Sequence, residues 1–482
     1  MSKRTLIDEH QELEQNSLGM KSAVESHSID FIPEHERHGT APKQAIFWTI
    51  ANFNIFSIAL GFIGPSLGLS LVWTIVAGAA GGIFGGIFVS FHASQGPRLG
   101  LPQMIQSRAQ FGYRGVLIPT IAVLFNFIVF NVLQTDVLKS GLNGVFGWNP
   151  TAIIIAVSAI AALLAIFGHN WLHKVFRVLF WVSAPFYLVL TIGMFTGGAA
   201  TQEPSSPGGF SATAFMIVFA TAMSYNLTLA PYVSDYTRYL PATIKTSHVV
   251  LAVQSGICFS LIWLMSMGAW LATHVGATDA LVGLNMAGNT MFPVFGTATA
   301  LLSVAGLIAV IGINTYSAGI AVATVIDCFK PIRSTRRLRI ACTVGLLLVW
   351  GTINLNLQGD QTVLITNLLS ILLYLLVPWT AVNLVDFFIV RKGHYSIAEI
   401  EQRDGMYGTW AWRGLTAYAA GLLFEVPFMV LSFYKGPATA LTAGIDISFV
   451  IGLIGAGAAY LVLSRSLKLD SELARIEEHP GL

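Results

Sequence analysis

Residues 45–65 read AIFWTIANFNIFSIALGFIGP. This stretch is long and apolar enough to cross a lipid bilayer, which takes about 20 such residues in a helix. It nevertheless carries Asn52 and Asn54 near its middle, with glycines and a proline towards its end. An unsatisfied polar group in hydrocarbon costs several kcal/mol. The pattern therefore predicts either amides that bind neighbouring helices or a helix that is broken here and presents its amides to a ligand.

The composition of the 482-residue chain places most of it in lipid. Hydrophobic residues make up 54% and charged residues 10% of the chain, against about 25% charged residues in soluble proteins. So few charges cannot cover a soluble protein of this length. The net charge of +2 argues against a nucleic-acid partner, which requires a basic face. The three cysteines lack CxxC spacing, and we expect no metal site and no cofactor.

Twelve segments are apolar enough to cross the bilayer as helices, which predicts an all-α integral membrane protein. They lie near 44–67, 70–92, 115–138, 151–168, 177–198, 210–233, 248–273, 291–326, 338–357, 361–388, 413–434 and 443–464. Of the 26 Lys and Arg residues, only Lys139 and Lys435 fall outside the alternate set of loops that includes both termini. The positive-inside rule then predicts a multi-pass protein of the plasma membrane with both termini in the cytoplasm.

The polar segments divide the chain further. We expect a disordered cytoplasmic tail at 1–43, a ten-helix core at 44–390, a cytoplasmic loop at 391–412, two peripheral helices at 413–465 and a second disordered cytoplasmic tail at 466–482. The oligomeric state is left open by the sequence.

A second interrupted span lies five spans after the first. Span 6 carries Ser224, Tyr225, Asn226 and Thr228 together near its middle, followed by Pro231. Transporters built from inverted repeats place discontinuous helices at corresponding positions of the two halves, with the substrate between them. Repeats at about 44–198 and 210–390 would give this offset. The alternative is that these residues bond across packed helices and that the proline only kinks the span.

Spans 3 and 8 also carry polar faces. Asn126, Phe130 and Gln134 recur every four residues and share one side of span 3, which Asn131 extends. Span 8 contains the polar run 314–317. We favour one shared site over separate packing contacts. The candidate substrate-binding residues are Asn52, Asn54, Phe130, Asn131, Gln134, Ser224, Tyr225, Asn226, Asn314 and Tyr316.

The amides indicate the kind of ligand. Asn and Gln present a donor and an acceptor side by side, which matches the N–H and C=O edge of a nucleobase or another cyclic amide. An aromatic ring on the same face can stack on a planar ligand. No charged residue lies in the middle of spans 1, 3, 6 or 8. The sequence therefore predicts a neutral, planar and polar substrate.

Three motifs resemble a known family. They are GPRLGLPQMIQSRAQFGYRG at 96–115, APYVSDYTRYLP at 230–241 and INTYSAG at 313–319. In this order and position they resemble the nucleobase:cation symporter-1 family, in particular its purine–cytosine permease branch. The resemblance runs from about residue 38 to residue 390 and continues weakly through spans 11 and 12.

The resemblance implies a LeuT-type fold, with two inverted five-helix repeats, broken helices 1 and 6, and two peripheral helices. It implies cation-coupled uptake of cytosine or purines by alternating access, with Gln134, Phe130 and Asn314 at substrate-contacting positions. In helix 6 the stacking tryptophan of relatives is replaced, and the nearest aromatic residue is Tyr225. A carrier of allantoin, hydantoin or a vitamin-like heterocycle is the alternative within the family. An intramembrane enzyme is a remote alternative, because the chain has no HExxH motif or paired catalytic carboxylates.

The coupling cation is predicted from the same comparison. Relatives that use sodium bind the ion between backbone carbonyls of broken helix 1, here near Ala51 and Asn54, and hydroxyl groups of helix 8. Residues 311–313, which precede Asn314, are isoleucine, glycine and isoleucine. Hard cations need several oxygen ligands. We therefore favour H⁺ over Na⁺ as the coupling cation.

Few carboxylates lie near the predicted bilayer. Glu425 in span 11 is at apparent bilayer depth, but a peripheral helix favours a structural or subunit-contact role. Asp136 and Lys139 are expected to form an ion pair, and Asp386 to be solvated at a helix end.

A gate is expected at the inner end of span 6. Asp235 and Arg238 lie there within the second family-like motif. We expect them to help close the cytoplasmic side of the transporter. The alternative is a salt bridge that only folds the loop.

Overall fold

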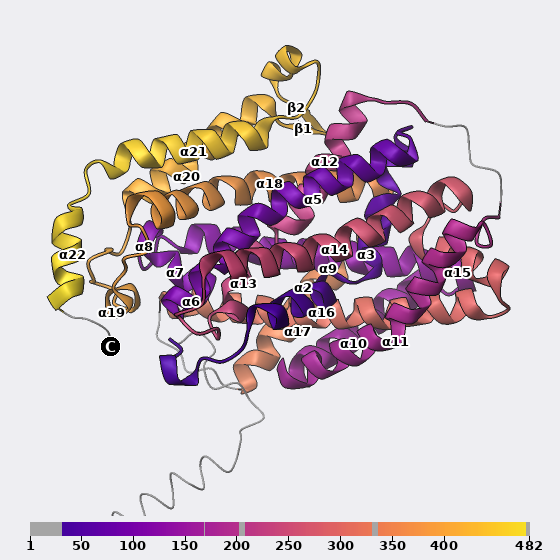
Figure 1. Cartoon of the computed structure of the whole chain (residues 1–482), viewed down its shortest axis with the longest axis horizontal. Coiled ribbons are helices and arrows are strands. Elements are labelled where there is room, and N and C mark those ends of the chain that lie inside the picture. The colour runs from indigo at the N-terminus through magenta and orange to yellow at the C-terminus, as the bar shows by residue number, and fades with distance from the viewer. Residues whose placement is uncertain (1–30, 168, 202–207, 330–335, 479–482) are drawn as a thin grey trace, which may run out of the picture.

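The protein is a bundle of long helices that run along its longest axis (Figure 1). The computed structural model describes residues 31–167, 169–201, 208–329 and 336–478. Within these ranges the only strands are the short pair β1 (Val430–Leu431) and β2 (Tyr434–Lys435). The all-α class is therefore confirmed.

Three groups of helices make up the bundle. The first group is α2 (Ala41–Asn52), α3 (Ile55–Gly61), α4 (Ile63–Ser66), α5 (Leu71–Ala93), α12 (Ala212–Leu227), α13 (Ala230–Thr237) and α14 (Thr246–His274). The second is α9 (Leu117–Phe146), α10 (Pro150–Phe167), α11 (His169–Thr196), α16 (Phe295–Asp327) and α17 (Arg336–Asn356). The third is α18 (Gln361–Val385), its π-helical end η2 (Asp386–Val390), α20 (Trp412–Glu425), α21 (Ser448–Ser464) and α22 (Leu469–Glu478).

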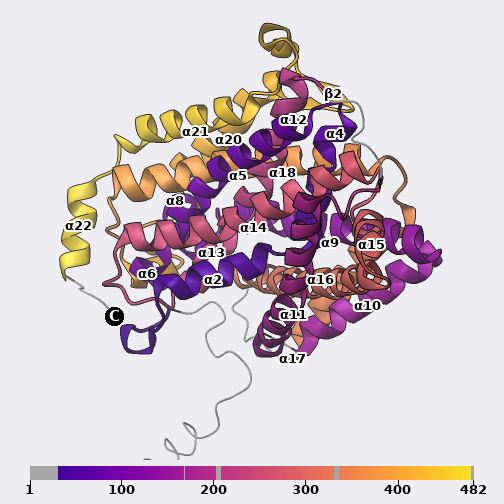
Figure 2. The same ribbon diagram turned by 45° about the vertical axis from the view of Figure 1, so that its right-hand side comes forward.

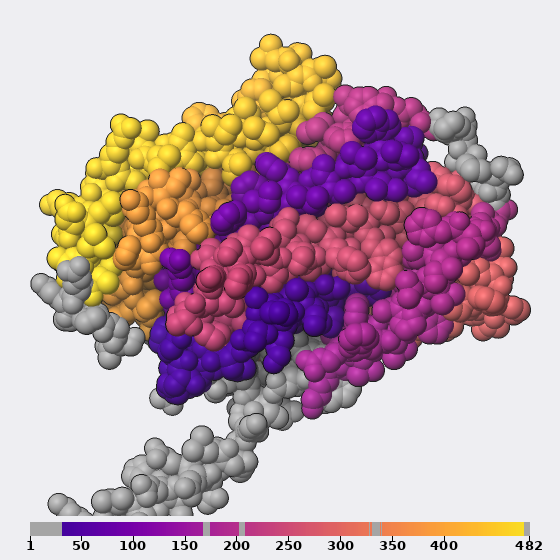
Figure 3. Space-filling view, viewed as in Figure 1, coloured from indigo at the N-terminus to yellow at the C-terminus, as the bar shows by residue number. Residues whose placement is uncertain are grey.

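Short helices connect these groups. They are η1 (Glu34–Glu36), α6 (Gln95–Leu99), α7 (Gln103–Gln106), α8 (Arg108–Phe111), α15 (Ala280–Met291), α19 (Ile397–Glu401), η3 (Val426–Phe428) and η4 (Pro437–Thr442). Helices of the first group pack on one another, with α14 between α5 and α2 on the face in Figure 3. Helices of the second group pack around α16, and α20 and α21 cover α18 (Figure 2).

Every predicted membrane segment contains a helix. In the part of the chain that the structure describes, seven helices are long and apolar enough to cross a membrane, and nine if each bent pair counts as one crossing. Helices α10 and α17 are shorter apolar helices. Each of the twelve predicted crossings therefore coincides with a helix. The number twelve is not confirmed, because only seven to nine spans of the described residues meet the criteria of length and apolar composition.

The first span is broken where its two asparagines lie. Helix α2 ends at Asn52, α3 begins at Ile55, and the two parts of the span are bent by 66°. Asn54 has an extended backbone, and its side-chain oxygen accepts a hydrogen bond from the Phe56 N–H at 3.1 Å. This N-cap starts the second helical segment. The predicted break is confirmed, and it falls at Phe53 and Asn54.

Span 6 is interrupted more gently. Thr228 and Leu229 separate α12 from α13 while keeping right-handed helical backbone angles. Thr228 donates its hydroxyl to the Tyr225 carbonyl at 2.7 Å, and Pro231 lies in the first turn of α13. The two segments together have the length and composition of one membrane span, Ala212–Thr237.

Glycines let α5 approach α12 closely. A Cβ atom at Gly81 or Gly85 would overlap the backbone carbonyl of Phe219 or Met223. We expect Gly85→Val to separate the two helices and destabilise the protein by about 1–3 kcal/mol, the usual cost of overpacking. Thermal unfolding of purified protein measures this effect. Gly345→Val is the control, because a Cβ atom there meets open space; equal melting temperatures for the two variants would contradict the packing account.

The two tails are partly ordered, which corrects the expectation of disorder. Ile32 is fully buried, and its N–H donates to the Gly100 carbonyl at 3.0 Å. Arg37 donates to the carbonyls of Ile32 and Pro97. At the other end, residues 469–478 form α22, which lies across the end of the bundle (Figure 1). The prediction failed because both segments are held by partners distant in sequence. Residues 1–30 and 479–482 of the predicted tails lie outside the described residues.

Candidate functional site

A cavity of about 470 Å³ lies between the broken first span, α9, α11, span 6 and α16. Its polar lining consists mainly of the amides Asn52, Asn54, Asn126, Gln134 and Asn314. Its aromatic lining is Phe47, Trp48, Phe127, Phe130, Phe176, Tyr225, Tyr232 and Tyr236. No carboxylate is among its described lining residues. This lining suits a neutral ligand with a flat ring and a polar edge.

Most of the predicted substrate-binding residues line this cavity. The six that do are Asn52, Asn54, Phe130, Gln134, Tyr225 and Asn314. The four that do not are Asn131, Ser224, Asn226 and Tyr316.

Three of the four outlying residues bond to neighbouring helices. Ser224 donates to the Leu369 carbonyl at 2.5 Å, and Asn131 donates to the Thr315 hydroxyl at 3.0 Å. Asn226 donates to the Gly82 carbonyl at 2.8 Å and accepts from the Asn52 amide at 3.1 Å. The sequence left packing between helices and ligand contact as alternatives, and these three residues make packing contacts.

Two amides of the cavity lining are hydrogen-bonded to each other. The Nδ2 of Asn314 on α16 donates to the Oε1 of Gln134 on α9 at 3.2 Å. Both side chains are largely buried. A ligand with adjacent donor and acceptor groups could exchange this bond for bonds of its own, so that no buried amide would lose its partner.

The aromatic residues form a second wall. The rings of Phe130 and Tyr225 have centroids 6.0 Å apart and are tilted by 43°, and Phe56 lies 5.8 Å from each of them. The Tyr225 hydroxyl accepts hydrogen bonds from Asn54 at 3.2 Å and from Ser57 at 3.0 Å. Tyr225 therefore links the break in the first span to the ring wall.

Several lining residues were not among the predicted site residues. Tyr232 and Tyr236 lie four residues apart on α13. The centroid of the Tyr236 ring lies 4.8 Å from that of Phe47 and 5.6 Å from that of Trp48. The motif 230–241 contains both tyrosines, and their spacing could have indicated a shared helical face. Asn126 donates to the Thr228 carbonyl at 3.2 Å. Its spacing placed it on the same face of span 3 as Phe130 and Gln134, although it was not among the predicted site residues.

The cavity reaches the end of the bundle where α2 begins. Lys43, in the first turn of α2, and Arg177, near the start of α11, belong to its lining. The same end of the molecule carries α22 (Figure 1). Because Lys43 and Arg177 are exposed, the cavity opens to the surface at this end of the molecule.

Near this opening, the predicted gate residues belong to a buried polar network. The Oδ1 of Asp235 accepts from the Gln103 N–H at 2.9 Å, and Ser234 donates to the Gln103 side chain at 2.6 Å. Gln103 then bonds to Gln95 at 3.1 Å, and Gln95 to Asn383 at 2.9 Å. Helix α13 is thus joined to α18 through the loop that follows α5. Arg238 is buried and donates to the Asp235 carbonyl at 3.3 Å.

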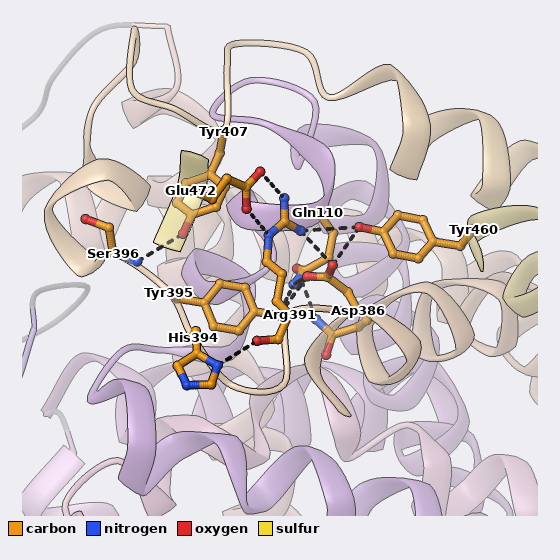
Figure 4. Close-up of polar contacts among 10 residues, drawn as sticks. Gln110, Asp386, Arg391, His394, Tyr395, Ser396, Tyr407, Tyr460 and Glu472 are labelled. Atoms are coloured by element: carbon orange, nitrogen blue, oxygen red, sulfur yellow. Dashed lines mark hydrogen bonds and ion pairs between the residues drawn. The ribbon is translucent and has the colours of Figure 1, made fainter. Parts of the chain in front are cut away.

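The network ends on a buried carboxylate (Figure 4). Gln110 bonds to Asn383 and donates to Asp386 at 2.6 Å. Asp386 also accepts from Arg391 at 2.6 Å and from the hydroxyls of Tyr395 and Tyr460 at 2.7 and 2.8 Å. The expectation that Asp386 is solvated is therefore wrong, because its partners come from three different segments and exclude water completely.

Arg391 connects this carboxylate to the C-terminal helix. Its Nε and Nη2 atoms donate to Glu472 of α22 at 2.9 and 3.2 Å. Burial alone lowers the pKa of Arg391, but Asp386 and Glu472 together raise it above its ordinary value. The guanidinium thus stays charged between two carboxylates.

The other carboxylates lie away from the substrate cavity. Asp136 and Lys139 form the predicted ion pair at 2.5 Å, and Asp136 also accepts from Gln361. Glu425 is fully buried between α20 and α21 against Gly452, and neither carboxylate oxygen has a hydrogen-bond partner among the described residues. The same part of the chain contains no group of three or more His, Cys, Asp or Glu residues that could hold a metal ion.

The broken span, the cavity beside it and the opening at one end define a secondary transporter. Residues 31–452 match the family described as permeases for cytosine/purines, uracil, thiamine and allantoin, and the chain belongs to that family. It is a permease and not an enzyme.

Some relatives with permease names match over most of the chain. The putative purine-cytosine permease YxlA of Bacillus subtilis is 34% identical over 92% of this chain and 96% of its own length. The purine-cytosine permease fcyB of Emericella nidulans is 23% identical over 91% of this chain and 88% of its own length. The allantoin permease of Bacillus subtilis is 23% identical over 90% of this chain and 92% of its own length.

A solved structure establishes the fold. Mhp1, a nucleobase-cation-symport-1 family transporter crystallised closed with bromovinylhydantoin, gives a TM-score of 0.72 at 19% identity. The match covers 95% of this chain and 99% of that structure. The LeuT-type fold implied by the sequence motifs is therefore confirmed.

Proposed function

We propose that this chain imports a neutral nucleobase, cytosine or a purine, by H⁺ symport with alternating access. The observation that carries the proposal is the amide pair Gln134–Asn314 beside the ring wall of Phe130 and Tyr225. Amides match the polar edge of a base, and aromatic rings match its face. The names of the relatives agree with this class of substrate.

The proposal includes an orientation in the membrane. The chain lies in the plasma membrane with both termini in the cytoplasm, as its Lys and Arg distribution supports. The opening lined by Lys43 and Arg177 then faces the cytoplasm, and the structure corresponds to the state that releases substrate.

Proton coupling is supported by the surroundings of the expected cation site. The Asn54 carbonyl already accepts a hydrogen bond from the Ser57 N–H at 3.1 Å, and the Asn52 carbonyl accepts from the Ser57 hydroxyl at 3.2 Å. Residues 311–313 offer no hydroxyl group. Uptake by membrane vesicles under imposed gradients tests this point. Uptake that follows a sodium gradient at fixed pH, with no proton dependence, would exclude H⁺ symport.

A second candidate function is transport of allantoin or a hydantoin. It is favoured by the similarity to an allantoin permease and to a structure holding a hydantoin. Both ligands contain a flat five-membered ring with the N–H and C=O groups of a cyclic amide. Uptake of radiolabelled cytosine by cells expressing the chain, competed by purines, pyrimidines, allantoin and hydantoins, separates the candidates. Competition by purines supports the main proposal, and failure of every nucleobase to compete would refute it.

The ring wall gives a prediction for substrate affinity. Stacking of a base on an aromatic ring contributes about 1–3 kcal/mol. We expect Phe130→Ala to raise the KM for cytosine about 5- to 150-fold, whereas Phe130→Trp should retain a low KM. Concentration-dependent uptake measures both. The prediction fails if alanine and tryptophan give the same KM at equal surface expression.

The gate gives a prediction for transport rate. Asp235 helps hold α13 to the Gln103 loop, and it lines a small cavity that shares Phe127 and Tyr232 with the substrate cavity. We expect Asp235→Asn to lower the maximal rate of uptake several-fold with a smaller change in KM, because a neutral amide weakens the hydrogen bond to the Gln103 N–H. Initial rates under saturating cytosine measure this. Unchanged transport would count against a gating role.

A further inference from the structure

A second cavity of about 290 Å³ lies at the bend between α21 and α22, where the two helices turn by 80°. It shares no lining residue with the substrate cavity. Its lining residues are Met406, Arg413, Ser466, Leu467, Lys468, Ser471, Glu472 and Arg475.

The lining of this hinge cavity is strongly basic. It contains the cations Arg413, Lys468 and Arg475 and one carboxylate, Glu472. Both oxygens of Glu472 are already bonded to Arg391. The Lys468 carbonyl accepts from the Ser471 hydroxyl at 2.7 Å, but within the described residues the side-chain ammonium of Lys468 and the guanidinium of Arg475 form no ion pair and no hydrogen bond. The cavity therefore holds uncompensated positive charge.

Other groups in the cavity suit an anion. Arg413 is oriented by Ser466, to which its Nε donates at 2.7 Å through the hydroxyl and its Nη2 at 3.2 Å through the carbonyl. The first turn of the ten-residue helix α22 lines the cavity through Ser471. The N–H groups of Ser471 and Glu472 already donate to the Lys468 carbonyl at 3.1 Å, so the three cations supply the attraction for an anion.

Lipid-facing residues lie directly beside the hinge cavity. Val462 is 59% exposed on the last turn of α21, four residues before Ser466. Trp410 and Trp412 are 53% and 52% exposed at the start of α20. In membrane proteins, exposed tryptophans are enriched at the membrane–water interface, at the depth of the lipid headgroups. The basic groups thus lie where a phospholipid phosphate would be.

We propose that the hinge cavity binds the phosphate of an anionic phospholipid headgroup through Arg413, Lys468 and Arg475. Free phosphate has the same chemistry, but the neighbouring apolar face of α21 provides a surface for acyl chains that only a lipid can use. Basic pockets at the cytoplasmic ends of membrane helices are suited to such headgroups. Bound lipid would neutralise the repulsion among the three cations and hold α22 against the end of the bundle.

Binding to the purified full-length protein in neutral detergent tests the proposal. Phosphatidylglycerol, phosphatidylcholine and inorganic phosphate are titrated separately, and the thermal unfolding midpoint is followed. The double variant Lys468→Gln/Arg475→Gln removes two cavity cations and leaves Arg413 with its structural bonds. The control Arg403→Gln/Arg465→Gln removes two exposed cations of the same region that do not line the cavity.

We expect phosphatidylglycerol to raise the midpoint saturably in the wild type and the control, while phosphatidylcholine does not. The cavity variant should bind phosphatidylglycerol about 30-fold more weakly, as expected from two lost charges near an anionic lipid. Equal weakening in the control, or unchanged binding in the cavity variant, would overturn the site. A response to inorganic phosphate without any response to phosphatidylglycerol would overturn the lipid assignment.

Discussion

Asp386→Ala is expected to destabilise the folded protein by about 3–5 kcal/mol, the cost of leaving one member of a buried ion pair without its partner. Arg391 would keep its charge beside a vacated carboxylate, with only Glu472 to balance it. The hydroxyls of Tyr395 and Tyr460 and the amide of Gln110 would lose an acceptor at the same time. We expect a much lower yield of folded protein and a lower thermal unfolding midpoint.

Asp404→Ala is the control for this prediction. Asp404 belongs to the loop that follows Arg391 but is exposed, so its removal should change stability by less than about 0.5 kcal/mol. Glu472→Gln gives an intermediate case, because a neutral amide can still accept one hydrogen bond from Arg391. If Asp386→Ala and Asp404→Ala unfold at the same temperature, the buried cluster does not stabilise the transporter.

Gln134→Leu is expected to raise the KM for cytosine by about 100-fold or more, with little change in folding. Leucine fills a similar volume but removes the amide that faces Asn314 in the cavity. A bound base would then bury polar groups without partners, and sites built on such bonds discriminate strongly when one is missing. Concentration-dependent uptake, corrected for the amount of protein in the membrane, gives the measurement.

The matched control is Asn131→Leu, an amide removed three residues earlier on the same helix. Asn131 bonds to Thr315 and does not line the cavity. Its loss should reduce stability and leave the KM for cytosine nearly unchanged. A larger KM effect at Asn131 than at Gln134 would show that the site lies on the other side of α9.

The sequence predicted the elements of the fold well because lipid imposes simple rules. Length and apolar composition located the helices, and the paired asparagines located the break at Phe53 and Asn54. The face of α9 followed from the spacing of Phe130 and Gln134. These predictions use only the nearest residues along the chain.

The rest depended on how the helices rotate and meet. Tyr225 lines the cavity and the adjacent Asn226 does not, because neighbouring residues on a helix point in directions about 100° apart. A sequence pattern without a register cannot distinguish them. Asp386 was mistaken for a solvated group because its partners Tyr395, Tyr460 and Gln110 are brought to it only by the folded chain.

Uptake of radiolabelled cytosine by purified protein in proteoliposomes tests the central claim most directly. With the external side more acidic, we expect cytosine to accumulate inside the proteoliposomes above its equilibrium level. Purines should compete with this uptake, and a protonophore that collapses the proton gradient should abolish the accumulation. The Gln134→Leu variant should accumulate almost none at the same cytosine concentration. Absence of cytosine uptake under any cation gradient, by protein that is folded and inserted, would contradict the account.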